Sequence, residues 1–505
     1  MNHLVIAPVL LPLLAGILPL LPHHPTMRQR RLFSIAAVVA QLGLALALMA
    51  AVSDGKILVY TLGHWPAPFG IVLVADRLAA WMLVITTLLA LFALLDAIRG
   101  ADTAGRHFHI LFQFQLFGLN GAFLTGDLFN LFVFFEVLLI ASYGLLLHGG
   151  GPERTRAGLH FVVVNLVGST LFLFAVGTLY GVLGTLNMAD LAVKAAAAPP
   201  ENVALIRAAG LVLFGVFALK AALLPFHLWL PAAYAHASAP VAALFAIMTK
   251  VGAYSMLRVH TLIFGAGAGP AAGLSEPWLL PLALATVIVG MLGAVASTHL
   301  RRQVAWLVVA SVGSLLAAFG LATTAGLAAG LYYLPHTTFA TAALFLLADA
   351  IARRRGALGD RLDPGPATTS PRLLGGLFFV AAMAVAGLPP LSGFLGKFLT
   401  LHAALDHPLL PWIMGTVLAG GLLGLIALAR TGSLLFYRVL PSEARAAEPW
   451  PALVRETLPI IGLLLLGLGL TVGAGPALDQ ARAIAAQMLE PQAYIQAVLN
   501  PGGTP

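Results

Sequence analysis

The sequence contains no cysteine and very few charged residues. Cysteine is absent from all 505 residues, which excludes disulfides, cysteine-ligated iron–sulfur clusters and thiolate zinc sites. Asp, Glu, Lys and Arg make up only 9% of the chain, whereas a soluble globular protein carries about 25%. Because 60% of the residues are hydrophobic, the composition is that of an integral membrane protein.

Nucleotide and metal motifs are also missing. The chain has no G-x-x-x-x-G-K-[ST], no H-E-x-x-H and no G-x-G-x-x-G placed between a strand and a helix. ATP is therefore not its direct energy source, and we expect no cofactor and no bound metal. A membrane glycosyltransferase would need carboxylates clustered in an outer loop, but the acids there are scattered, as Asp190 and Glu201 illustrate.

Apolar runs recur along the whole chain. Each approaches the roughly 20 residues that an α-helix needs to cross a bilayer, whereas a β-barrel would show alternating segments of about ten residues. The first run is followed, not preceded, by basic residues, so we expect a retained helix and not a cleaved signal peptide. The fold class is thus all-α with about fourteen transmembrane helices, predicted to begin near residues 3, 31, 72, 107, 128, 160, 205, 237, 278, 302, 327, 372, 412 and 455.

The distribution of basic residues predicts an orientation. With the N-terminus outside, eighteen of the 27 Lys and Arg residues fall in cytoplasmic loops, six fall outside and three lie within spans. The positive-inside rule therefore predicts that both termini lie on the outer side. The net charge of +8 reflects this topology and an attraction to membrane lipids, and no nucleic-acid partner is expected.

Four ionisable residues stand inside apolar spans: Glu136, Lys220, Lys250 and Lys397. Inserting such a group at a helix centre costs about 2.5–3.5 kcal/mol, so these residues usually face a bundle interior or a wetted path for ions. Glu136 and Lys220 could instead form a purely structural ion pair. In the functional interpretation, moving the carboxylate towards or away from Lys220 favours proton uptake or release by the lysine.

Two spans are interrupted beside these lysines. Pro225 and Pro231 follow Lys220, and Pro389 and Pro390 precede Lys397. Prolines break helices, and interrupted helices at corresponding places in two halves of a transporter point to its ion site. The interrupted helices 7 and 12 are five apart, which predicts two inverted five-helix repeats. The expected divisions are 1–106 for helices 1–3, 107–262 for helices 4–8, 278–436 for helices 9–13, 455–475 for helix 14 and 476–505 for an amphipathic tail on the membrane surface or against a partner.

Histidines and aspartates are weaker indications. His336 and His227 lie in apolar context, where each could relay protons or simply pack as a hydrogen-bonded core residue. Four aspartates fall near predicted helix ends, where capping or hydration explains them: Asp76, Asp96, Asp127 and Asp349.

Three segments resemble one known family. TGDLFNLFVFFEVLLIASYGLLL, ALKAALLPFHLWLPAAYAHASAPVAALFAIMTKVGAY and AGLPPLSGFLGKF are similar to signature helices of the antiporter-like subunits shared by respiratory complex I and the Mrp-type cation/proton antiporters. The length of the whole chain and the residue patterns of the first two segments most resemble the D-type subunits of Mrp antiporters, also called Pha or Mnh. The sequence departs from the complex I pattern in WLPAAYAHASAP, which lacks an acidic residue.

This resemblance implies a fourteen-helix subunit in which Glu136 and Lys220 form a pair, Lys250 is the central relay and Lys397 the terminal lysine. It also implies assembly with the other Mrp subunits, of types A, B, C, E, F and G, in a bacterial inner membrane. The implied activity is exchange of Na⁺, or of K⁺ or Li⁺, for H⁺. We expect protons to pass through Lys220, Lys250, His336 and Lys397, with Glu136 modulating the first lysine and His227 as an accessory.

Two alternatives remain open at this point. The same proton line could be driven by electron transfer in partner subunits, as in respiratory complex I or a membrane-bound hydrogenase. The buried charges could also belong to a scaffold, in which they only hold neighbouring helices together.

Overall fold

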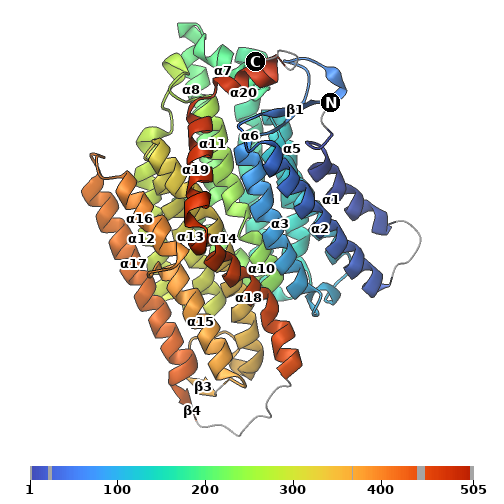
Figure 1. The fold of residues 1–505 in the computed structure, drawn as a ribbon, viewed down its shortest axis with the longest axis vertical. Helices are drawn as coiled ribbons and strands as arrows, with labels where there is room; N and C mark the ends of the chain where they lie inside the picture. The colour runs from blue at the N-terminus through green and yellow to red at the C-terminus, as the bar shows by residue number, and fades with distance from the viewer. Residues whose placement is uncertain (1–2, 21–25, 367, 441–449, 501–505) are drawn as a thin grey trace.

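The computed structural model describes residues 3–20, 26–366, 368–440 and 450–500. Its long helices run roughly side by side as one bundle (Figure 1). In this described part, eleven helical segments are long and apolar enough to cross a membrane, and three shorter apolar helices accompany them. These segments coincide in order with the fourteen predicted spans, so the chain is a multi-pass membrane protein.

The helices of the first half follow the predicted spans closely. One addition is α7, a short amphipathic helix in a segment expected to be a loop. The helices are α1 (Ala7–Ile17), α2 (Met27–Ala51), α3 (Arg77–Ala97), α4 (Phe108–Leu124), α5 (Leu128–Leu147), α6 (Pro152–Leu183), α7 (Met188–Ala196), α8 (Pro200–Ala221), α9 (Trp229–His236), α10 (Ala239–Phe245) and α11 (Met248–Leu262).

The second half contains one very long helix, α14, which continues through Pro335. Its helices are α12 (Glu276–Ala296), α13 (Leu300–Phe319), α14 (Thr324–Arg354), α15 (Pro371–Ala386), α16 (Ser392–Ala403), α17 (Leu410–Gly432), α18 (Trp450–Val472), α19 (Ala474–Leu489) and α20 (Gln492–Leu499).

Local sequence explains where several helices begin and break. Asp76 and Asp127 accept backbone N–H groups as N-caps of α3 and α5, which confirms the capping interpretation of these two aspartates. The predicted interruptions are confirmed in both spans. One separates α8 from α9 and contains Pro225, and the other separates α15 from α16 and contains Pro389 and Pro390.

Short strands mark the two ends of the bundle. At one end, β1 (Leu58–Thr61) pairs antiparallel with β2 (Val72–Ala75), near α7, α20 and both chain termini (Figure 1). At the other end, β3 (Gly365–Pro366) pairs parallel with β4 (Val439–Leu440). Both termini at one end agree with an even number of membrane crossings.

Burial separates central from peripheral helices. The apolar windows of α10–α11 and of α14 are 100% and 94% buried, whereas those of α2 and α17 are only 33% buried. The segments that carry Lys250 and His336 therefore form the centre of the bundle, and the peripheral helices form its outer layer.

The C-terminal tail does not lie where we expected it. The amphipathic pattern of residues 476–505 predicted a helix on the membrane surface or against a partner, but α19 runs along the bundle and packs against α14 and α11 of its own chain (Figure 1). Ile484 and Ala485 are fully buried there. These helices cover the apolar stripe of α19. The periodicity of the sequence reveals such a stripe but does not identify the surface that covers it. The last five residues of the predicted tail lie outside the described residues.

Candidate functional site

Lys220 lies in the last turn of α8, immediately before the break in its span. It is 5% exposed, and its ammonium contacts the backbone oxygen and Oδ1 of Asn165 at 3.4 and 3.2 Å and Ser169 Oγ at 3.5 Å. The Asn165 amide donates to Phe161 O at 2.9 Å, which leaves Oδ1 free to accept from the lysine. Asn165 and Ser169 lie one turn apart on α6 and so form one polar face towards Lys220.

Glu136 joins this cluster through Ser169. The Ser169 hydroxyl donates to the Glu136 carboxylate, and the same oxygen contacts the Lys220 ammonium. Among the described residues, Glu136 and Lys220 form no direct ion pair, because the serine lies between them. The expected pairing of carboxylate and lysine is therefore a bridged contact, in which a small shift of Glu136 changes the surroundings of Lys220.

The broken backbone after α8 is hydrogen-bonded by side chains from other elements. The Trp229 indole donates to Leu219 O at 3.0 Å, and Thr286 Oγ1 of α12 accepts from the Leu224 N–H at 3.0 Å. These contacts satisfy backbone groups that an uninterrupted helix would pair internally. The break is thus a fixed feature of the bundle that holds Lys220 in place.

Gly252 allows α11, the helix that carries Lys250, to pack against this break. A Cβ at position 252 would lie 2.4 Å from Ala221 N and 2.7 Å from the carbonyl carbon of Lys220, closer than side-chain atoms can approach. Only glycine allows α11 to touch the backbone of α8 here. Lys250, half a turn earlier on α11, is thereby held near the end of α8 that carries Lys220.

Lys250 is the most enclosed charged residue of the predicted set. Its side chain is 0% exposed, and its Nζ has no hydrogen-bond partner among the described residues. The neighbouring Thr249 hydroxyl is likewise unpartnered. A buried ammonium without acceptors is strongly unfavourable, so this lysine must be neutral or be solvated by internal water when it carries a proton.

His336 lies on the central helix α14, which packs against α16, the helix that carries Lys397, and against α10, which directly precedes the helix that carries Lys250. Its Nδ1 is 2.9 Å from Ser392 Oγ, and the Ser392 hydroxyl donates to Gly467 O at 3.1 Å. Since that hydroxyl has one hydrogen, both contacts are satisfied when His336 donates from Nδ1. Nε2 then keeps its lone pair and can accept a proton.

Lys397 lies on α16, just after the second break. Its Nζ donates to Ala386 O at 2.7 Å, the carbonyl of the last residue of α15. Carbonyl groups at a helix C-terminus lack internal partners and carry partial negative charge, which favours a cation. The lysine is partly exposed and, among the described residues, has no carboxylate partner.

His227 lies in the first break but does not join the lysine cluster. It is buried, its ring centroid is 5.7 Å from that of Trp306, and its Nδ1 has no partner among the described residues. No hydrogen bond links it to Lys220 within the described part of the chain. The same described residues contain no group of three or more His, Asp or Glu side chains that could hold a metal ion.

The sequence interpretation missed four residues at this site: Asn165, Ser169, Gly252 and Ser392. Asn165 and Ser169 had a detectable signal, since polar residues four apart share one face of an otherwise apolar helix. Ser392 and Gly252 had none, because small residues are common in membrane helices.

A further missed cluster lies at the end of the bundle that holds both termini. Arg258 and Asp76 are buried and form a bidentate ion pair at 2.6 and 2.8 Å that joins α11 to the start of α3. The guanidinium also lies 5.6 Å from the Tyr254 ring and 5.2 Å from the Tyr494 ring of α20. The C-terminal helix α20 thus covers the C-terminal part of α11, the helix that carries Lys250.

Comparison with known proteins places this arrangement in a family. A family model described as NADH:quinone oxidoreductase/Mrp antiporter, TM, matches residues 125–424. The chain is 41% identical to the D-type subunit of a probable K(+)/H(+) antiporter from Rhizobium meliloti (strain 1021), over 99% of this chain and 98% of that protein. It is 38% identical to the D-type subunit of the Na(+)/H(+) antiporter from Alkalihalophilus pseudofirmus OF4, over 99% of this chain and all of that protein.

Solved structures agree with these sequence relatives. A chain in the structure of the Mrp complex from Dietzia sp. DQ12-45-1b superposes with a TM-score of 0.88 at 29% sequence identity. The alignment covers 99% of this chain and 100% of that chain, so the similarity extends over the whole bundle.

Proposed function

The chain belongs to the NADH:quinone oxidoreductase/Mrp antiporter family, and from this premise we propose that it is the proton-translocating subunit of a multisubunit Na⁺(K⁺)/H⁺ antiporter. It is a secondary transporter subunit and not an enzyme. The observation that carries the proposal is Lys250, a fully buried lysine whose Nζ has no acceptor among the described residues. In sequence it lies between two broken spans that each hold another lysine.

In the proposed mechanism, protons move along Lys220, Lys250, His336 and Lys397. Lys220 holds its proton while Asn165, Ser169 and the bridged Glu136 carboxylate stabilise the ammonium. When Glu136 moves away, the protonated form loses this stabilisation and the proton passes to Lys250 over internal water. His227 stays an accessory candidate whose role depends on water reaching the first break.

Electrostatic repulsion couples neighbouring sites of the line. Two positive charges about 10 Å apart repel by roughly 1.7 kcal/mol at an effective dielectric constant of about 20. A proton that arrives on one lysine therefore favours release from the next. His336 accepts through Nε2, and Lys397, held at the carbonyl end of α15, delivers the proton towards the far side.

We further propose the assembly, location and internal symmetry that the resemblance implies. The chain would work with Mrp subunits of types A, B, C, E, F and G in a bacterial inner membrane, with both termini on the outer side. Residues 107–262 and 278–436 would form the two inverted repeats. The two breaks, five spans apart, support this division. Na⁺, K⁺ and Li⁺ are the candidate cations.

The second candidate function is redox-driven proton pumping in a complex I-like assembly. It would use the same residues, because the proton line is common to the family. The relatives with 41% and 38% identity are both named as antiporter subunits, which favours cation/proton exchange.

Dye-monitored exchange in inverted vesicles that contain the whole gene cluster tests the proposal. We expect Na⁺ or K⁺ to dissipate the imposed proton gradient in the wild type and to have no effect with Lys250→Ala. Lys194→Ala is the matched control, because Lys194 lies in the outer helix α7, where Asp190 pairs with it at 2.9 Å. Wild-type exchange in the Lys250 variant would refute the relay, and no cation response in the assembled wild type would favour the redox-driven alternative.

A further inference from the structure

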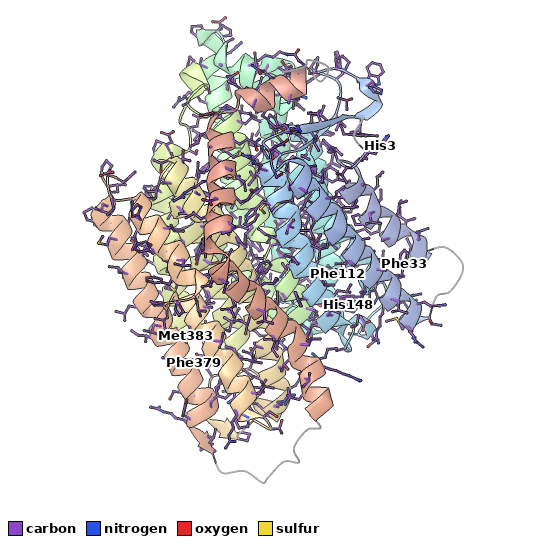
Figure 2. All side chains as sticks on the ribbon, viewed as in Figure 1. His3, Phe33, Phe112, His148, Phe379 and Met383 are labelled. Carbon is purple, nitrogen blue, oxygen red and sulfur yellow. The ribbon has the colours of Figure 1, made fainter. Side chains whose placement is uncertain are left out.

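A groove runs along the contact between α15 and α17 and is bordered by the π-helical turn Ser433–Tyr437 that follows α17. The groove has a volume of about 700 Å³. Its lining is almost entirely apolar and includes Phe378, Phe379, Met383, Leu388, Leu425 and Phe436. Figure 2 labels Phe379 and Met383 on α15 at this edge of the bundle. Phe379 is 64% exposed, so a large aromatic side chain faces whatever fills the groove.

Glycines keep the groove open. Gly376 lines it, and a Cβ built there would meet nothing within 4 Å. Gly375 and Gly432 line it as well, from opposite helices. Larger side chains at these positions would partly fill the space, so the groove exists because these positions are glycines.

One end of the groove has an arginine in its lining, and two further arginines lie directly beside lining residues in the sequence. Arg372 lines it, Arg430 directly follows the lining residue Ala429, and Arg438 directly follows Tyr437. All three side chains are exposed, and none has an ion-pair partner within the described part of the chain. Arg372 also lies in the first turn of α15, where the helix dipole favours an anion. This end of the groove is therefore complementary to a negative charge.

The length of the groove corresponds to one leaflet. From Arg372 to Ala386, the last residue of α15, the helix advances by fourteen residues, or about 21 Å at 1.5 Å per residue, and the groove continues to Leu388. Half of a bilayer that is about 40–45 Å thick including its headgroups is about 20–22 Å. A partner's transmembrane helix would need a groove through the whole membrane, whereas a lipid needs one charged end and one leaflet.

We propose that this groove is a binding site for one anionic phospholipid. Its phosphate lies among Arg372, Arg430 and Arg438, and one acyl chain follows α15 to Leu388. Basic pockets between transmembrane helices bind anionic headgroups in this way. The end of the acyl chain covers the membrane side of the break in which Lys397 binds Ala386 O, and it keeps bulk lipid and stray water away from that contact.

Native mass spectrometry of the purified complex measures this binding independently of transport. In titrations with phosphatidylglycerol and phosphatidylcholine, we expect the wild type to retain one phosphatidylglycerol at this site in preference to phosphatidylcholine. Arg372→Gln and Arg430→Gln should each weaken retention about fivefold. Gly376→Leu, whose Cβ would meet no other atom within 4 Å, places a larger side chain in the groove and should abolish retention.

Two controls separate the site from general lipid coating. Gly415→Leu places the same side chain on an exposed part of α17 outside the groove, and Arg302→Gln removes an exposed arginine elsewhere in the protein. Both should retain the lipid as the wild type does, and the mass of the complex reports assembly in every variant. Equal retention of the two lipids, or unchanged retention in Gly376→Leu, would overturn the proposal.

A single-cysteine cross-link identifies the occupant directly. Because the chain has no cysteine, Phe379→Cys creates one attachment point for a maleimide photo-crosslinker inside the groove. Irradiation in native membranes should give an adduct whose added mass is that of a phospholipid. An adduct with another subunit would show that a protein occupies the groove and would refute the lipid site.

Discussion

Lys220 precedes the break in its span, whereas Lys397 follows the break in its own. Lys220 is surrounded by side chains of α6, which connect it through Ser169 to the Glu136 carboxylate. Lys397 contacts a backbone carbonyl of α15 and has no acid beside it among the described residues. In the proposed repeats, α13 corresponds to α5, and α13 carries no acidic residue in place of Glu136.

The difference separates an adjustable site from a constant one. A carboxylate on a neighbouring helix can move or change its charge, so the first lysine responds to events elsewhere in the assembly. A carbonyl at a helix end keeps the same partial charge throughout. We therefore expect proton transfer to be controlled at Lys220, beside the first break, and protons to be delivered by Lys397, beside the second. The following variants test that contrast.

Removal of either lysine should have the largest effect. Lys220→Ala and Lys397→Ala should each lower exchange by at least about 100-fold, because a relay without one of its proton carriers must cross an apolar gap. Exchange in inverted vesicles, normalised to assembled complex, measures this. If Lys397→Ala retained wild-type exchange, the second break would not belong to the path.

Neutralising Glu136 should affect only the first site. Glu136→Gln keeps an oxygen that accepts from Ser169 but loses the charge, and interactions with charged groups are worth about 1.5–3 kcal/mol, so exchange should fall about tenfold or more. Glu153→Gln, at the exposed start of α6, is the matched control and should leave the rate unchanged. Equal rates in wild type and Glu136→Gln would leave the carboxylate with a structural role alone.

An acid can be added beside the second lysine. A Cβ at Gly421 of α17 would lie 4.0 Å from Lys397 Nζ, so Gly421→Asp brings a carboxylate to the ammonium. The added charge should hold the proton on Lys397 and slow exchange about fivefold, as expected for about 1 kcal/mol. Gly421→Asn has the same size without the charge and separates electrostatics from packing. Identical rates for the two variants would contradict the contrast between the two breaks.

The ion pair under α20 should have the smallest effect on exchange per assembled complex. Arg258→Met leaves Asp76 buried without its partner, which typically costs about 3–5 kcal/mol of stability. The amount of assembled complex should fall steeply, while each remaining complex exchanges at the wild-type rate. Measuring the amount of complex and the exchange rate in the same vesicles separates an effect on assembly from an effect on transport. A lower exchange rate per complex would place Arg258 on the proton path.

Much of the fold was predictable because membrane insertion imposes simple rules. The lengths of the apolar runs predicted the spans, and the prolines predicted both breaks. Asp76 and Asp127 cap helices as expected. The tail was predicted wrongly at α19, because an amphipathic pattern shows that a helix has an apolar face and not which surface covers it.

The partners at the candidate site were much less predictable. Asn165 and Ser169 reach Lys220 from 55 and 51 residues away, and Ser392 meets His336 across 56 residues. Such contacts depend on how helices pack side by side. Helix periodicity indicates which residues share a face but does not indicate which faces meet.

By itself, the sequence determined the membrane class, the order of the apolar helical segments, the two breaks and the presence of three lysines and one glutamate in apolar surroundings. These follow from local properties, since each depends on a residue and its neighbours along the chain. Only the tertiary structure decided that a serine bridges Glu136 to Lys220, that Lys250 has no protein acceptor among the described residues and that Lys397 binds a helix end. Those features depend on distances between separate helices, and such distances are set by packing.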